Sequence, residues 1–117
     1  MPLRCLIVDD NHEFLVSAST LLSSQGLEIV GTASTGPDAI RQAESLRPDV
    51  VLVDVQLGDE DGLELARQLD ERIPGIAMVL ISTHSREDVM ELAGDSPAAG
   101  FLPKTALSAE AIASLVD

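Results

Sequence analysis

The sequence lacks the features that mark membrane, disulfide-stabilised or nucleic-acid-binding proteins. It contains no apolar run long enough to span a bilayer, and its single cysteine cannot form an internal disulfide. The N-terminus has no long apolar region of the signal-peptide kind, which predicts a cytoplasmic protein. Only 7 residues are lysine or arginine against 20 acids, and the net charge of −13 disfavours direct nucleic-acid binding.

Aromatic residues are also scarce, with two phenylalanines and no tyrosine or tryptophan. The core must therefore consist mainly of valine, isoleucine, leucine and alanine. Cys5 lies within the first apolar run, where a small buried hydrophobe is expected instead of a reactive thiol. No repeat, linker or low-complexity segment divides the 117 residues, so one domain with one core is predicted.

Strand-like and helix-like patterns alternate along the whole chain. Strands are predicted over 4–9, 27–33, 50–54, 76–81 and 99–102. Helices are predicted from 11 to about 25, from 36 to before 48, from 63 to before 74, from 85 to about 93, and from 108 onward. Five such units predict an α/β fold with a five-stranded parallel sheet covered by helices on both faces. A switch point between the first and third strands gives the order 2-1-3-4-5.

Charged residues follow three of the apolar runs: Asp9 and Asp10 after 6–8, Asp54 after 50–53, and Lys104 after 101–103. In an open parallel sheet, ligands bind at the carboxyl ends of the strands, beside the switch point. The sequence therefore predicts a small charged pocket there, suited to a divalent cation and a phosphoryl group.

The order and spacing of these segments resemble the receiver domain of two-component response regulators. The matching elements are the acid pair at 9–10, the segment 54–62, Ser82 after 79–81, and the segment 100–104. The sequence segments 31–33, 47–52 and 101–104 are most similar to those in receivers of LuxR-type (NarL/FixJ-like) regulators. The resemblance implies a flavodoxin-like receiver domain over 1–117. It leaves open whether Asp117 is a natural end or whether an effector domain follows.

The resemblance implies a phosphoacceptor and a Mg²⁺ site. Asp54 would accept a phosphoryl group, since a carboxylate can attack phosphorus and form an acyl phosphate. Asp10 and Asp54 would bind Mg²⁺ directly, with Asp9 acting through water and the backbone carbonyl of Gln56 as a further ligand. Hard oxygen ligands of this kind suit Mg²⁺.

The resemblance also implies a switch that is not a turnover enzyme. Lys104 would pair with Asp54 and then with a phosphoryl oxygen, and Ser82 would donate its hydroxyl to another. Phe101 would swing inward when Ser82 moves, although a rare aromatic also suits the core. The donor would be a sensor histidine kinase or a small phosphodonor. The output would be homodimerisation or control of an effector that regulates transcription.

Two further residues are expected beside the pocket. Gln56 lies two positions after Asp54, and His84 two after Ser82, so both are predicted to tune dephosphorylation. Many receivers have proline where this chain has Gly58, which predicts a more mobile loop.

Simpler structural readings remain open for the site residues. Asp54 could cap a loop, and Asp9 and Asp10 could be acids that favour a helix N-terminus. Lys104 could be a solvated lysine, and Ser82 could satisfy only local backbone.

Three other functions compete with the phosphorylated switch. A haloacid dehalogenase-type hydrolase would want an acid at position 56, where Gln56 stands. A flavodoxin-like cofactor binder would want a phosphate loop after the first strand, where the acids at 9–10 repel phosphate. A receiver used only for docking would not need its acid, hydroxyl and lysine positions filled.

Overall fold

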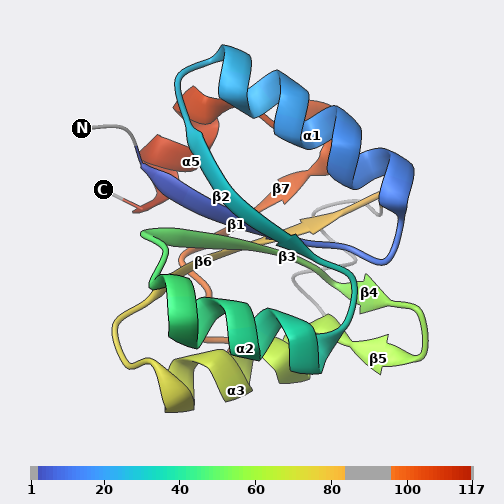
Figure 1. Ribbon diagram of the computed structural model, residues 1–117, viewed down its shortest axis with the longest axis vertical. Helices are drawn as coiled ribbons and strands as arrows, with labels where there is room; N and C mark the ends of the chain where they lie inside the picture. The colour runs from blue at the N-terminus through green and yellow to red at the C-terminus, as the bar shows by residue number, and fades with distance from the viewer. Residues whose placement is uncertain (1–2, 84–95, 117) are drawn as a thin grey trace.

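Five parallel strands form the central sheet in residues 3–83 and 96–116, the part of the chain that the computed structural model describes (Figure 1). They are β1 (Arg4–Val8), β2 (Glu28–Ala33), β3 (Val50–Asp54), β6 (Ala77–Ser82) and β7 (Gly100–Pro103). The strands lie in the order β2-β1-β3-β6-β7, and every pairing is parallel. Because β6 and β7 are the predicted fourth and fifth strands, the fold class and the order 2-1-3-4-5 are confirmed.

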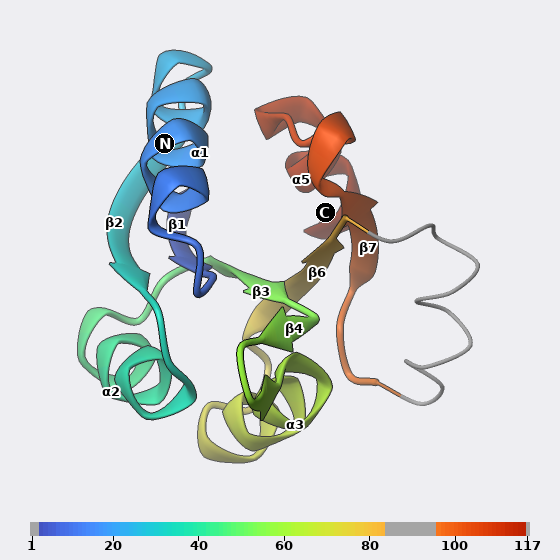
Figure 2. The same cartoon turned by 90° about the vertical axis from the view of Figure 1, so that its right-hand side faces the viewer.

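Helices cover both faces of this sheet (Figure 2). Helices α1 (His12–Ser24) and α5 (Ala109–Val116) lie on one face, and α2 (Gly36–Leu46) and α3 (Gly62–Arg72) on the other. A short 3₁₀ helix, η1 (Lys104–Ala106), follows β7. The helix predicted over 85–93 lies outside the described residues. No described helix combines the length and the hydropathy needed to cross a bilayer.

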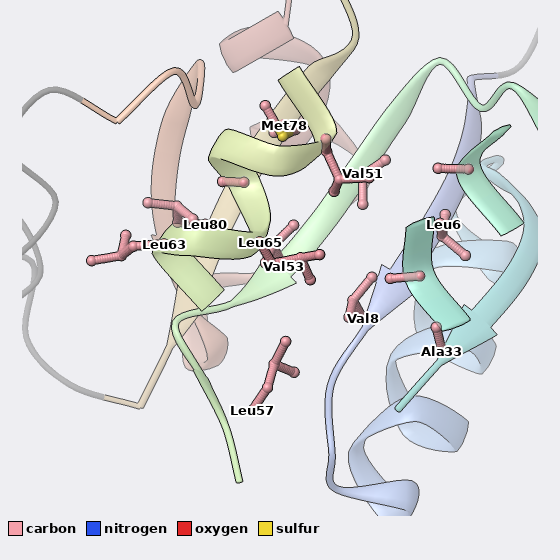
Figure 3. Close-up of a cluster of buried hydrophobic side chains, with 14 of the residues drawn as sticks. Leu6, Val8, Ala33, Val51, Val53, Leu57, Leu63, Leu65, Met78 and Leu80 are labelled. Atoms are coloured by element: carbon pink, nitrogen blue, oxygen red, sulfur yellow. The ribbon is translucent and has the colours of Figure 1, made fainter. Parts of the chain in front are cut away.

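The buried strands send alternate side chains to opposite faces, which is why they read as continuous apolar runs. In β1, Leu6 and Val8 pack beneath α2 and α3, whereas Cys5 and Ile7 pack beneath α1 and α5. Figure 3 shows the first of these two clusters, where side chains from β1, β3 and β6 meet those of α3. Both faces are thus filled by aliphatic side chains, as the scarcity of aromatics predicted.

Capping side chains and a glycine mark where the helices begin and end. Asn11 is the N-cap of α1, and its side chain accepts a hydrogen bond from the Phe14 N–H. Ser108 does the same for α5, accepting from Ala111 N–H at 3.0 Å. Gly26 follows α1 with a φ of +98°, a left-handed conformation that glycine adopts without strain.

One prediction needs correction after β3. The sequence predicts only a loop between the strand 50–54 and the helix that begins at 63. The structure instead has a hairpin of β4 (Gln56–Leu57) and β5 (Glu60–Asp61), and α3 already begins at Gly62. Gly58 has a φ of +60° at the first position of the two-residue turn, which favours glycine and excludes proline. Strands of two residues are too short to give an alternating pattern, so the sequence showed no sign of them.

Candidate functional site

Four strand ends meet at one edge of the sheet. Asp9 directly follows β1, Asp54 ends β3, Ser82 ends β6, and Lys104 directly follows β7. The strands are in register, with Val8 beside Val53, Asp54 beside Ile81, and Ser82 beside Pro103. The four strand-end residues line a pocket of about 310 Å³. The rest of its lining consists of Asp10, Asn11, Gln56, Gly58 and Thr83. The sheet therefore brings the predicted acids, hydroxyl and lysine into one pocket.

Lys104 is the cation of this pocket. Its Nζ lies 2.5 Å from Asp9 Oδ2 and 3.6 Å from Asp54 Oδ2. The lysine side chain is only 14% exposed, and Asp9 is fully buried. Burying these charges would be costly without the pairing, so the lysine compensates two carboxylates that the sheet forces together.

Three carboxylates lie close together in this pocket. Asp9, Asp10 and Asp54 each offer a carboxylate oxygen, and these oxygens lie within 4.8 Å of one another. Asp9 Oδ1 accepts a hydrogen bond from Asn11 N–H at 2.9 Å. Asp9 Oδ2 is buried, and its described partner is the Lys104 ammonium. An all-oxygen donor set with excess negative charge fits a hard divalent cation such as Mg²⁺.

The pKa of Asp54 is raised from 3.8 to about 6. Burial is the main cause, because it disfavours the charged carboxylate, and the negative charge of Asp9 adds to it. The ammonium of Lys104 and the hydrogen bond from Gln56 N–H to Asp54 Oδ1, at 3.3 Å, oppose the rise. Asp54 is thus a carboxylate held in an unfavourable electrostatic environment, which is common at functional sites.

The backbone around Asp54 is closely packed against the start of α3. A Cβ atom at Gly62 would overlap the Asp54 carbonyl oxygen. The Gly62 N–H also donates to the Val55 carbonyl at 2.9 Å. Only glycine fits at this position, and the close approach fixes the backbone that carries the carboxylate.

The hairpin after Asp54 is also attached to α2. Glu60 Oε2 accepts a hydrogen bond of 2.7 Å from Gly36 N–H, at the first position of α2. The Thr35 side chain caps the same helix by accepting from Asp38 N–H at 3.3 Å. A carboxylate at a helix N-terminus is favoured by the helix dipole as well as by the hydrogen bond. Glu60 therefore ties the segment after Asp54 to the neighbouring helix.

The remaining predicted residues are placed as follows. Gln56 lines the pocket and is an exposed residue of β4. Phe101 is partly buried and packs against the cluster beneath α2 and α3, so in this structure it is a core contact. His84 lies outside the described residues.

Phe14 is a site residue that the sequence did not reveal. Its ring lies beneath the Lys104 ammonium, with Nζ 4.4 Å from the ring centroid. Phe14 lies within the helix predicted from 11 to about 25, and no local pattern connects it with a lysine far along the chain.

Known proteins match the chain in both sequence and structure. A family model described as the response regulator receiver domain matches residues 5–116. The VraR response regulator proteins of Staphylococcus saprophyticus and Staphylococcus epidermidis are each 33% identical to it, over 90% and 99% of the chain. These matches cover 51% and 56% of the two proteins, so the chain spans about half the length of these curated relatives.

Two solved structures extend the match to the fold. The signal receiver domain of a response regulator named NarL from Mycobacterium tuberculosis has 28% identity and a TM-score of 0.82. The match covers 98% of this chain and 93% of that one. The signal receiver domain of a modulated diguanylate cyclase from Desulfovibrio desulfuricans G20 has 27% identity and a TM-score of 0.82, covering 99% and 91% of the two chains.

Proposed function

Since the chain belongs to the response regulator receiver domain family, we propose that it is a signalling switch activated when Asp54 accepts a phosphoryl group. The observation that carries this proposal is the convergence of three carboxylates and one ammonium on the carboxyl edge of the sheet. Receiver domains are generally not turnover enzymes, and this one is proposed to act once per phosphorylation event. The donor would be a sensor histidine kinase or a small phosphodonor.

The proposed step is an in-line displacement at phosphorus. A carboxylate oxygen of Asp54 forms the new bond to phosphorus. The bond between phosphorus and the donor breaks, and its electron pair leaves with the donor's oxygen or imidazole nitrogen. With a pKa of about 6, Asp54 is mainly ionised at neutral pH, as a nucleophile must be.

The residues present suit Mg²⁺. Asp10 and Asp54 would hold the ion through their carboxylates, with the backbone carbonyl of Gln56 as a further ligand and Asp9 acting through water. The ion would supply positive charge that offsets the repulsion between Asp54 and the incoming phosphoryl group.

Lys104 and Ser82 would read the phosphorylated state. Lys104 already lies 3.6 Å from Asp54 Oδ2, and it would pair with a phosphoryl oxygen after transfer. Ser82, which lines the pocket, would donate its hydroxyl to another phosphoryl oxygen. Phe101 would then move inward and change the face formed by β7 and α5.

The proposed output is homodimerisation or control of a transcriptional effector of the LuxR type. The VraR relatives extend well beyond the part that this chain matches, which supports an effector in such proteins. We place the protein in the cytoplasm, where a histidine kinase would reach it. With a net charge of −13, the chain itself would not bind nucleic acid directly.

The lifetime of the signal would depend on the mouth of the pocket. Gln56 lines the pocket and can orient or obstruct the water that attacks phosphorus. His84 is proposed to act in the same way. Substitution of either residue should change the rate of phosphate loss and leave phosphorylation itself intact.

Intact-mass spectrometry after incubation with Mg²⁺ and acetyl phosphate tests the proposal. The parent should gain one phosphoryl group that hydroxylamine removes, and EDTA should prevent the gain. Asp54→Asn should gain none, whereas Asp59→Asn, an exposed acid in the same hairpin, should behave like the parent. Equal labelling of the parent and Asp54→Asn would contradict the assignment.

A further inference from the structure

The Lys104 ammonium is bounded by two carboxylates and one aromatic ring. Nζ lies 2.5 Å from Asp9 Oδ2, 3.6 Å from Asp54 Oδ2 and 4.4 Å from the centroid of the Phe14 ring. The negative face of an aromatic ring attracts a cation at this distance. Because the lysine side chain is only 14% exposed, the ring takes a place around the ammonium that water would otherwise occupy.

The ring of Phe14 is itself held in place. Its backbone N–H donates to Asn11 Oδ1 at 3.2 Å in the first turn of α1. The partly buried side chain packs against the cluster beneath α1 and α5. Phe14 therefore gives the ammonium a fixed partner that belongs to α1, whereas Asp9 and Asp54 belong to the sheet edge.

We propose that Phe14 is a positioning residue for Lys104, and that this contact transmits the phosphorylation state of Asp54 to α1. This inference rests on the proposed phosphorylation of Asp54. Before transfer, the ring helps to hold the ammonium beside the acceptor carboxylate. A phosphoryl group on Asp54 adds negative charge next to Nζ, which draws the ammonium toward the new oxygens and away from the ring. The first turn of α1 then experiences a different environment in the two states.

The chain is well suited to a direct test by fluorine NMR, because Phe14 and Phe101 are its only aromatic residues apart from two histidines. Protein made with 4-fluorophenylalanine should give two signals, and Phe101→Leu assigns them. Lys104→Met, without any phosphodonor, should shift the Phe14 signal. Arg67→Met, which removes the cation of an exposed ion pair on α3, should leave that signal unchanged. A Phe14 signal that is insensitive to Lys104→Met would overturn the contact.

The second arm follows the same signal during phosphorylation with Mg²⁺ and acetyl phosphate. As intact mass shows the protein gaining a phosphoryl group, the Phe14 signal should move in the direction seen for Lys104→Met. An unchanged Phe14 signal in fully labelled protein would overturn the transmission to α1. Absence of labelling would instead refute the proposed function. The comparison of the parent with Lys104→Met, made without phosphodonor, would still show whether Lys104 contacts the Phe14 ring.

A kinetic arm separates positioning from simple packing. Phe14→Leu should slow the labelling of Asp54 about two- to fivefold, from the strength of such cation–π contacts, and Phe14→Trp should restore the rate. Val16→Ala, at an exposed position of the same helix, should have the parent's rate. Equal rates for the parent and Phe14→Leu would refute the positioning role.

Discussion

Replacing Asp54 with asparagine should make the metal-free protein more stable at neutral pH. The native fold raises the pKa of this carboxyl from 3.8 to about 6, chiefly by burying it and secondarily by placing it near Asp9. Between these two pH values the native state therefore binds more protons than the unfolded state. The contribution of this carboxyl to the free energy of unfolding is therefore fully present below pH 3.8, where it is protonated in both states. It is lost as the pH rises through about 6.

The size of the effect follows from the pKa values. Each tenfold change in proton affinity corresponds to about 1.4 kcal/mol, so the rise to a pKa of about 6 sets an upper bound of roughly 3 kcal/mol. The pocket opens to solvent beside the exposed Asp10, which weakens the penalty. We expect Asp54→Asn to raise the free energy of unfolding by about 1–2 kcal/mol above pH 7, and by close to zero near pH 4.

Urea unfolding in EDTA measures this difference. Far-ultraviolet circular dichroism is the suitable probe, because the chain has no tryptophan or tyrosine to follow by fluorescence. The parent and Asp54→Asn should be compared across the pH range, with Asp59→Asn as the control for removing one acid from the surface. Added Mg²⁺ should reduce the advantage of Asp54→Asn, because the ion binds the parent better. A variant that is less stable than the parent at pH 7, or a gain that does not change with pH, would refute the reasoning.

Three other predictions concern the fold. Gly62→Ala should destabilise the protein by about 3 kcal/mol in the same assay, since its Cβ would overlap the Asp54 carbonyl; an unchanged midpoint would contradict the close approach. Glu60→Ala should lower the free energy of unfolding by about 1 kcal/mol, because it removes the hydrogen bond from Gly36 N–H at the start of α2. Glu64→Ala, which breaks an exposed ion pair, should lower it little. Equal effects of Glu60→Ala and Glu64→Ala would refute the stabilising role of the Glu60 hydrogen bond. The Cys5 thiol, whose pKa burial raises to about 12, should resist Ellman's reagent in native protein and react once in denaturant. Rapid native labelling would show that the thiol is accessible.

Much of this fold follows from patterns that a sequence shows directly. Strands buried on both faces must be continuous apolar runs, so β1 and β3 were visible in the residues before Asp9 and Asp54. Once the sheet is parallel, its strand ends must share an edge, and the meeting of these acids with Lys104 follows.

The rest depends on contacts between residues that are distant in the sequence. Nothing near Glu60 indicates that it caps α2 through Gly36, because the hydrogen bond depends on where the hairpin lies in space. Phe14 fits a helical core pattern equally well whether or not an ammonium lies above its ring. Such pairings are set by the three-dimensional arrangement and leave no periodic trace.

The central claim is that Asp54 is the phosphoacceptor, and locating the label tests it most directly. Protein incubated with Mg²⁺ and acetyl phosphate can be reduced with borohydride, which converts an aspartyl phosphate to homoserine, and the peptides can then be read by tandem mass spectrometry. We predict homoserine at position 54 and at no other aspartate. Homoserine at Asp9 or Asp10, with Asp54 unmodified, would contradict the account.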